Sequence, residues 1–176
     1  MERLGHGQTV LLLHGFPDEL QLWNAVAPRL EAAGFHVIAL DQRGCGASEA
    51  PAGLRHYHID RLVGDAAGVL KALGSHSPVH VLGHDWGAAV TWCLAITHPG
   101  IVRSAVAVSV GHPTEYARAG LEQKRKGLYT MGWQFPVLAE RWLVANDWAR
   151  MRHWLRQHPD PDACLRNLAR TGRLTA

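Results

Sequence analysis

The sequence has little of what marks an exported, membrane-bound or metal-binding protein. Only three cysteines occur among its 176 residues, far apart at positions 45, 93 and 164. An odd number at such spacing argues against a disulfide framework and a zinc site, and is typical of a reducing compartment. No apolar run approaches the roughly 18 residues of a membrane span, and the opening MERL lacks the apolar core of a signal peptide. We therefore expect a cytoplasmic protein with no membrane partner, no metal and no cofactor.

An excess of charge of one sign is also missing. The net charge is +3 and the isoelectric point is near 9.0, which are mild values. The densest basic run, KRK at residues 124–126, is more typical of a solvated helix face than of a nucleic-acid patch. The Gly-Cys-Gly at residues 44–46 lacks the third glycine of a dinucleotide fingerprint and does not open a helix. These features argue against nucleic-acid partners and a dinucleotide-binding site.

The first two thirds of the chain alternates short apolar runs with helical patterns. Alternation of this kind predicts right-handed βαβ crossovers, a mostly parallel sheet and helices on both faces. We expect β-strands at residues 9–13, 35–40, 79–82 and 102–110, and helices at 23–33, 59–73 and directly after residue 85.

The composition and the hydrophobic pattern change after residue 111. The remainder is helical in pattern, rich in tryptophan and arginine, and has no strand-like run. We therefore predict an α/β core at residues 1–111 and a helical lid at residues 112–176.

One stretch, VHVLGHDWGAAVTWCLAITH at residues 79–98, indicates where the chemistry takes place. An apolar strand turns sharply and resumes as a helix, with Ala89, Trp92, Cys93 and Ile96 on one face. Asp85 stands at the apex, with Gly83 and Gly87 two residues to either side. This is the pattern of a nucleophile elbow, in which a side chain at a flanking position would clash with the neighbouring backbone.

The apex residue decides the kind of chemistry. A carboxylate attacks amides and esters poorly, but it can open an sp³ carbon that carries a strained or good leaving group, giving an ester on the enzyme. Asp85 therefore indicates epoxides or carbon–halogen bonds. A Gly-x-x-x-Gly pair arises about once by chance in a chain of this length, so the motif needs its context.

Four stretches in order supply that context: HGFP at 14–17, DQRGCGAS at 41–48, GHDWGA at 83–88 and YTMGWQFP at 129–136. Together they resemble the α/β-hydrolase superfamily and, within it, the epoxide hydrolases. The haloalkane dehalogenases share the aspartate elbow and the following tryptophan. They usually differ at the position of Phe16 and in the loop after the second strand, so they are the alternative.

The resemblance implies a role for each matching residue. Asp85 would be the nucleophile, and the backbone N–H groups of Phe16 and Trp86 would form the oxyanion hole. Pro17 would be the cis-proline that turns the Phe16 amide towards the site. Tyr129 would protonate the opening epoxide of a small apolar substrate, unless it only packs within the lid. The supporting motif residues would be His14, Gly15, Gly83, His84 and Gly87.

Two parts of the family's machinery have no counterpart in this sequence. The family places a histidine base and its carboxylate beyond the lid, and a second lid tyrosine after the first, whereas Tyr129 is the last tyrosine here. We therefore expect a partial epoxide hydrolase that cannot turn over, or a catalytically inactive remnant that retains a pocket for small apolar ligands. The identity of the epoxide and the oligomeric state are left open.

Overall fold

The computed structural model describes residues 1–4, 7–75, 77–118, 120, 122, 125, 136–158 and 160–170. The chain divides into two compact units, Met1–Gly111 and His112–Ala176. Each unit has its own helices, and only the first contains strands among the residues that the structure describes.

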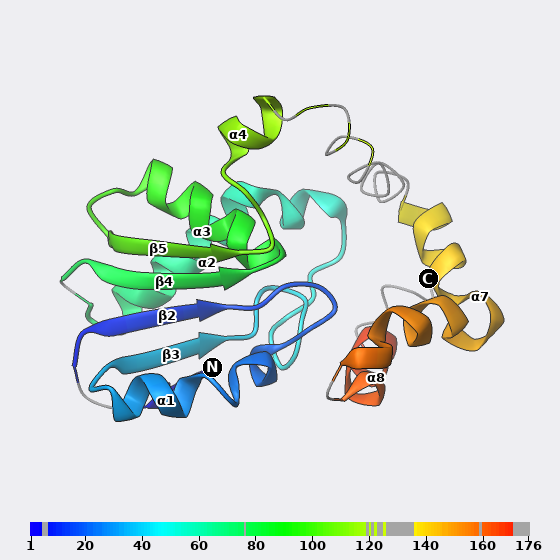
Figure 1. Ribbon diagram of the computed structural model, residues 1–176, viewed down its shortest axis with the longest axis horizontal. Coiled ribbons are helices and arrows are strands. Elements are labelled where there is room, and N and C mark those ends of the chain that lie inside the picture. The colour runs from blue at the N-terminus through cyan, green and yellow to red at the C-terminus, as the bar shows by residue number, and fades with distance from the viewer. Residues whose placement is uncertain are drawn as a thin grey trace. The chain divides into compact units, whose positions relative to one another are not determined.

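The first unit is built on a five-stranded sheet (Figure 1). Its strands lie in the order β1-β3-β2-β4-β5, so β4 is interior, between β2 and β5. Strands β3, β2, β4 and β5 are parallel, which confirms the predicted four-stranded parallel sheet. Their bounds are β1 Glu2–Leu4, β2 Thr9–Leu13, β3 His36–Leu40, β4 Val79–His84 and β5 Val102–Val108.

Strand β1 was not predicted. It runs antiparallel to β3, with Glu2 opposite Ala39 and Leu4 opposite Val37. Three residues are too few to show the two-residue period of a strand. Strand β1 forms because it pairs with β3 at the edge of the sheet, and such pairing cannot be recognised from the local sequence.

The helices of the first unit follow the predicted order. They are η1 Leu20–Trp23, α1 Ala27–Ala32, η2 Leu54–Tyr57, α2 Ile59–Ala72 and α3 Trp86–Thr97. The single helix expected at residues 23–33 is instead a 3₁₀ turn followed by the shorter α1. Pro28 lies in the first turn of α1. Because proline has no N–H to donate, it fits the start of a helix and not its interior.

Two apolar clusters cover the two faces of the sheet. Successive residues of β2 point to opposite sides, as in any strand. Leu11 and Leu13 pack in a cluster with residues of α2 and α3, whereas Val10 and Leu12 pack in a cluster with residues of η1 and α1. The helices therefore lie on both faces, as predicted.

Helix α3 lies where it was predicted, and its most buried face is not the one formed by Ala89, Trp92, Cys93 and Ile96. The buried residues are Gly87, Ala88, Val90, Thr91 and Leu94. The face formed by Ala89, Trp92, Cys93 and Ile96 lies outside this set, and Ile96 is 57% exposed. Nearly every residue of α3 is apolar, so helical spacing alone does not show which side meets the sheet. The small residues Gly87 and Ala88 lie against the strands because they permit close approach.

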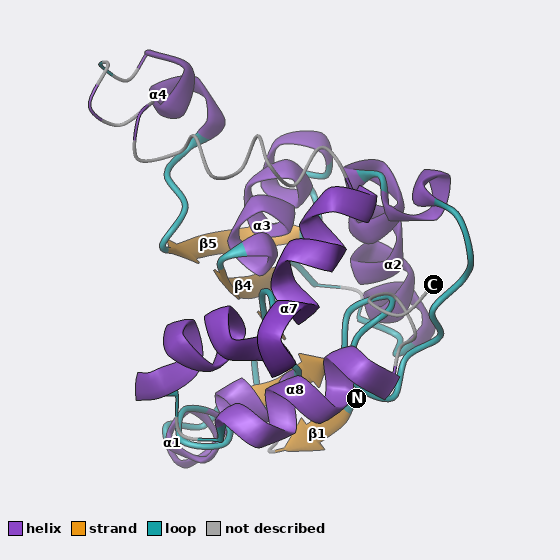
Figure 2. Cartoon of the chain, turned by 90° about the vertical axis from the view of Figure 1, so that its right-hand side faces the viewer, coloured by secondary structure: helices purple, strands orange, loops and turns teal. Residues whose placement is uncertain are grey.

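The described part of the second unit is helical (Figure 2). It contains α4 Pro113–Arg118, α7 Pro136–Trp154, η3 Leu155–Gln157 and α8 Pro161–Arg170. Helix α7 is interrupted where Asn146, Asp147 and Trp148 have φ values of 55°, 53° and 61°. The function of this unit as a lid stays a prediction.

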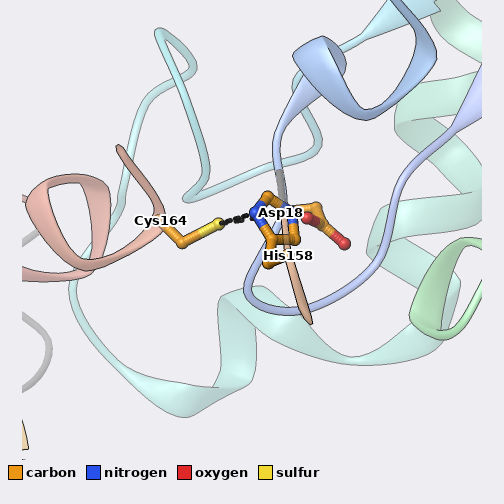
Figure 3. Close-up of side chains that lie close together, drawn as sticks. All are labelled: Asp18, His158 and Cys164. Atoms are coloured by element: carbon orange, nitrogen blue, oxygen red, sulfur yellow. Dashed lines mark hydrogen bonds between the residues drawn. The ribbon is translucent and has the colours of Figure 1, made fainter. Parts of the chain in front are cut away.

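Aromatic contacts occur within α7, and a sulfur contact joins α8 to the residue that follows η3. The rings of Trp142 and Trp154 lie 5.6 Å apart, and the Arg150 guanidinium lies 4.6 Å from the Trp142 ring centre. The sulfur of Cys164 lies 3.7 Å from Nδ1 of His158 (Figure 3); Asp18, labelled in the same view, belongs to the first unit. In the part of the chain that the structure describes, no helix is long and apolar enough to cross a membrane.

Candidate active site

Asp85 occupies the sharp turn between β4 and α3. Its φ and ψ are 52° and −119°, a conformation that non-glycine residues rarely adopt. Its N–H donates to the carbonyl of Val108 at 3.1 Å, and its carbonyl accepts the N–H groups of Ala88 and Ala89 at 2.9 and 3.2 Å. The backbone of Asp85 is therefore held from the β5 side and from the helix side at once.

The two glycines of the elbow allow this close packing. A Cβ on Gly83 would overlap the carbonyl of Gly87 and Oγ1 of Thr91. A Cβ on Gly87 would overlap the carbonyl oxygens of Leu13 and His14. Helix α3 thus approaches the ends of β2 and β4 more closely than any residue with a side chain would permit at these positions.

The loop after β2 brings a backbone amide to the Asp85 carboxylate. Phe16 N–H donates to Asp85 Oδ1 at 2.9 Å, and the Phe16–Pro17 peptide bond is cis. A Cβ on Gly15 would lie 2.6 Å from the same oxygen. Glycine at this position therefore lets the loop lie directly against the carboxylate.

The second expected oxyanion donor, the amide of Trp86, belongs to the first residue of α3. The first N–H groups of a helix have no partner within the helix, and the helix dipole favours negative charge near them. Trp86 is 58% exposed. Convergence of the Trp86 and Phe16 amides on one point stays a prediction.

His14 is fully buried behind this loop. Its Nδ1 is 2.8 Å from the carbonyl oxygen of Gly15, and its Nε2 accepts the N–H of Gln42 at 3.0 Å. The Gln42 side-chain amide donates to the His14 carbonyl. A carbonyl only accepts and a backbone amide only donates, so the ring is neutral with its proton on Nδ1. Burial lowers the pKa of His14, against opposing effects of the Gly15 hydrogen bond and the charges of Asp41, Asp18 and Asp85.

Gln42 is the residue that the sequence interpretation missed. It lies within the DQRGCGAS stretch, but the pattern gave it no role. Its neighbours have structural functions: Asp41 accepts the amides of Leu20 and Ala47, both at 2.9 Å, and Arg43 forms a two-point ion pair with Asp65. Only the spatial proximity of the loops after β2 and β3 reveals the contact between Gln42 and His14.

The remaining expected site residues differ in outcome. Nδ1 of His84 is buried and has no hydrogen-bond partner among the described residues. Tyr129 lies outside the described residues. Within its described residues, neither unit alone gathers three histidine, cysteine or acidic side chains around one point.

A cavity of about 660 Å³ lies elsewhere in the first unit. It is lined by α2 and by the loop after β3, with Gln42, Arg43, Leu62, Asp65 and Val69 among its walls. Asp85, Phe16 and Trp86 do not line it. This cavity is therefore separate from the elbow.

Comparison with known proteins identifies the fold family. The family model described as the alpha/beta hydrolase fold matches residues 8–170. The chain belongs to the α/β-hydrolase fold family. Among the similar proteins, Epoxide hydrolase B from Mycobacterium tuberculosis is 44% identical over 104 residues, which are 59% of this chain and 29% of that protein. Epoxide hydrolase A from the same organism is 36% identical over 170 residues, covering 91% and 52%.

A solved structure gives the same family. The Bacillus megaterium epoxide hydrolase in complex with an inhibitor is 27% identical and aligns with a TM-score of 0.82, covering 98% of this chain and 66% of that chain. The chain thus spans less than a third of the first of these two curated relatives and about half of the second.

Replacing Gly87 tests the packing of the elbow. We expect Gly87→Ala to lower the free energy of unfolding by about 1–3 kcal/mol, because the added methyl overlaps two carbonyl oxygens. The matched control is Gly68→Ala in α2, where a Cβ has open space. There the removal of a helical glycine should stabilise by roughly 0.5–1 kcal/mol. Urea denaturation measures the free energy of unfolding of both variants. Equal values for the two would contradict the elbow geometry.

Stability should also fall in mild acid because of His14. Its pKa is lowered in the folded state from the ordinary 6.5, so below that pH the unfolded chain binds more protons and the free energy of unfolding decreases. This loss begins as the pH falls through about 6.5 and continues towards the lower folded pKa. Urea midpoints at several pH values measure it, and His14→Gln should flatten the dependence below about pH 6.5. An unchanged slope in His14→Gln would contradict a buried neutral ring.

Proposed function

We propose that this chain carries the nucleophile of an epoxide-hydrolase-like enzyme, in which Asp85 opens a small apolar epoxide. The observation that carries the proposal is the Asp85 carboxylate at the elbow, with Oδ1 bound by the Phe16 amide. The similar proteins are epoxide hydrolases, which supports the same chemistry. The proposal includes an α/β core at residues 1–111 and a lid at residues 112–176.

The two carboxylate oxygens of Asp85 have different tasks in this reaction. The Phe16 amide holds Oδ1, which leaves Oδ2 as the oxygen that attacks. Oδ2 forms a bond to one epoxide carbon, the strained C–O bond breaks, and its electron pair stays on the epoxide oxygen. That oxygen takes up a proton, which we assign to the Tyr129 hydroxyl. The product of this half-reaction is an ester of Asp85.

The second half-reaction places charge on the oxygen that the amide already holds. When water adds to the ester carbon, the carbonyl electrons move to Oδ1, where the Phe16 and Trp86 amides would stabilise the oxyanion. Collapse of this intermediate releases the diol and restores the carboxylate. The step needs a general base, and no residue of this chain takes that role in the proposal.

A carbon–halogen bond could be attacked by the same carboxylate. The two substrates leave different traces on the protein. An epoxide adds its whole mass to Asp85, whereas a haloalkane adds only its alkyl group because the halide departs. Intact mass therefore distinguishes the epoxide reaction from dehalogenation.

The test is incubation of the purified chain with styrene oxide, followed by intact mass and diol measurement. We expect one covalent adduct per chain, long-lived, with diol not exceeding one equivalent, because the proposal assigns no residue of this chain as the base that activates the hydrolytic water. The adduct should be lost in Asp85→Ala. It should persist in Asp60→Ala, which removes an exposed carboxylate from the first turn of α2.

Two outcomes would contradict this proposal. Equal labelling of Asp85→Ala would mean that another nucleophile reacts. Sustained diol production that depends on Asp85 would mean that a histidine of this chain acts as the base.

A further inference from the structure

The peptide unit between Gly15 and Phe16 is hydrogen-bonded at both ends. Its N–H donates to Asp85 Oδ1 at 2.9 Å, and its carbonyl oxygen, which belongs to Gly15, is 2.8 Å from His14 Nδ1. The carbonyl and the N–H of one peptide are fixed in a plane and point in opposite directions. Whatever holds the Gly15 carbonyl therefore also sets the direction of the Phe16 N–H.

We propose that His14 is a positioning residue for the Phe16 amide, which it aims at Asp85 through the Gly15 carbonyl. This inference rests on the proposed role of Asp85 and Phe16. His14 does not touch the carboxylate in the proposal and acts only through the intervening peptide.

The ring of His14 is itself prevented from turning. Its Nε2 accepts the Gln42 N–H at 3.0 Å, and the Gln42 side chain binds the His14 carbonyl. A ring flip would place a carbon where Gln42 needs an acceptor. A protonated ring would set two N–H groups against each other. Gln42, which follows β3, thus fixes the tautomer that donates to Gly15.

The arrangement also strengthens the donor. A hydrogen bond received at a peptide carbonyl polarises the amide and makes its N–H a better donor, most of all where water is excluded. His14 is fully buried. The stronger hydrogen bond is made to Oδ1, on which negative charge develops when the Asp85 ester is cleaved.

Two substitutions of His14 separate its two nitrogens. Asparagine can place its side-chain NH₂ near the position of Nδ1, which keeps a donor for Gly15 but removes the acceptor for Gln42. Glutamine can place its carbonyl oxygen near the position of Nε2, which keeps the acceptor but removes the donor. If His14 only stabilises the fold, any change in either variant should follow the loss in its free energy of unfolding. The positioning role predicts that they differ.

The kinetic readout is cleavage of the Asp85 ester by hydroxylamine, which needs no enzyme base. The chain is first alkylated with styrene oxide, then treated with hydroxylamine and followed by intact mass. Loss of one oxyanion donor slows acyl transfer about 10²-fold or more, so a misdirected donor in His14→Gln should slow cleavage by about tenfold or more. His14→Asn should stay near the wild-type rate. Equal rates in the two variants would overturn the inference.

A readout without catalysis keeps this test separate from the proposed function. The Phe16 amide resonance in ¹H–¹⁵N spectra reports its hydrogen bond to Asp85. It should move strongly upfield in His14→Gln and little in His14→Asn, at a pH where both variants are folded. If the wild type forms no ester, the proposed function fails and the spectra still decide the role of His14. An unmoved Phe16 resonance in His14→Gln would overturn the positioning role even where the ester forms.

Discussion

The hydrogen bond from Phe16 N–H to Asp85 Oδ1 depends on the register of the sheet. Leu13, the last residue of β2, lies opposite Gly83 of β4, and His84 lies opposite Val108 of β5. The loops that follow β2 and β4 therefore leave the same edge side by side. A slip of one residue would send every side chain of the strand to the other face and separate the amide from the carboxylate. The buried apolar clusters on both faces are what fix that register.

The strained backbone of Asp85 is tolerated because its neighbours leave it no alternative. A residue in such a conformation costs on the order of 1–3 kcal/mol. Its amide is bonded to β5, its carbonyl to the first turn of α3, and its carboxylate to the loop after β2. The same contacts that offset the strain also orient the carboxylate. Stability and chemistry thus rely on one set of interactions at the elbow.

The features that the sequence could predict are those that depend on residues close together in the chain or on family motifs. The parallel strands, the elbow at Asp85 and the approach of the Phe16 amide depend on local patterns and on family motifs, so they were predicted. Strand β1 exists through pairing with β3, and the buried face of α3 is decided by packing around Gly87. The contact between His14 and Gln42 joins residues 28 positions apart. None of these three leaves a periodic trace in the sequence.

The most direct test of the account is to locate the covalent adduct within the chain. Fifteen aspartate and glutamate residues compete for an epoxide. Among those that the structure describes, Asp85 stands at the turn between β4 and α3 with Oδ1 bound by the Phe16 amide, whereas Asp41 has both oxygens bound by backbone amides. After reaction with one equivalent of styrene oxide, proteolysis and tandem mass spectrometry should place the ester on Asp85. Labelling spread over exposed carboxylates, with Asp85 unmodified, would contradict the account.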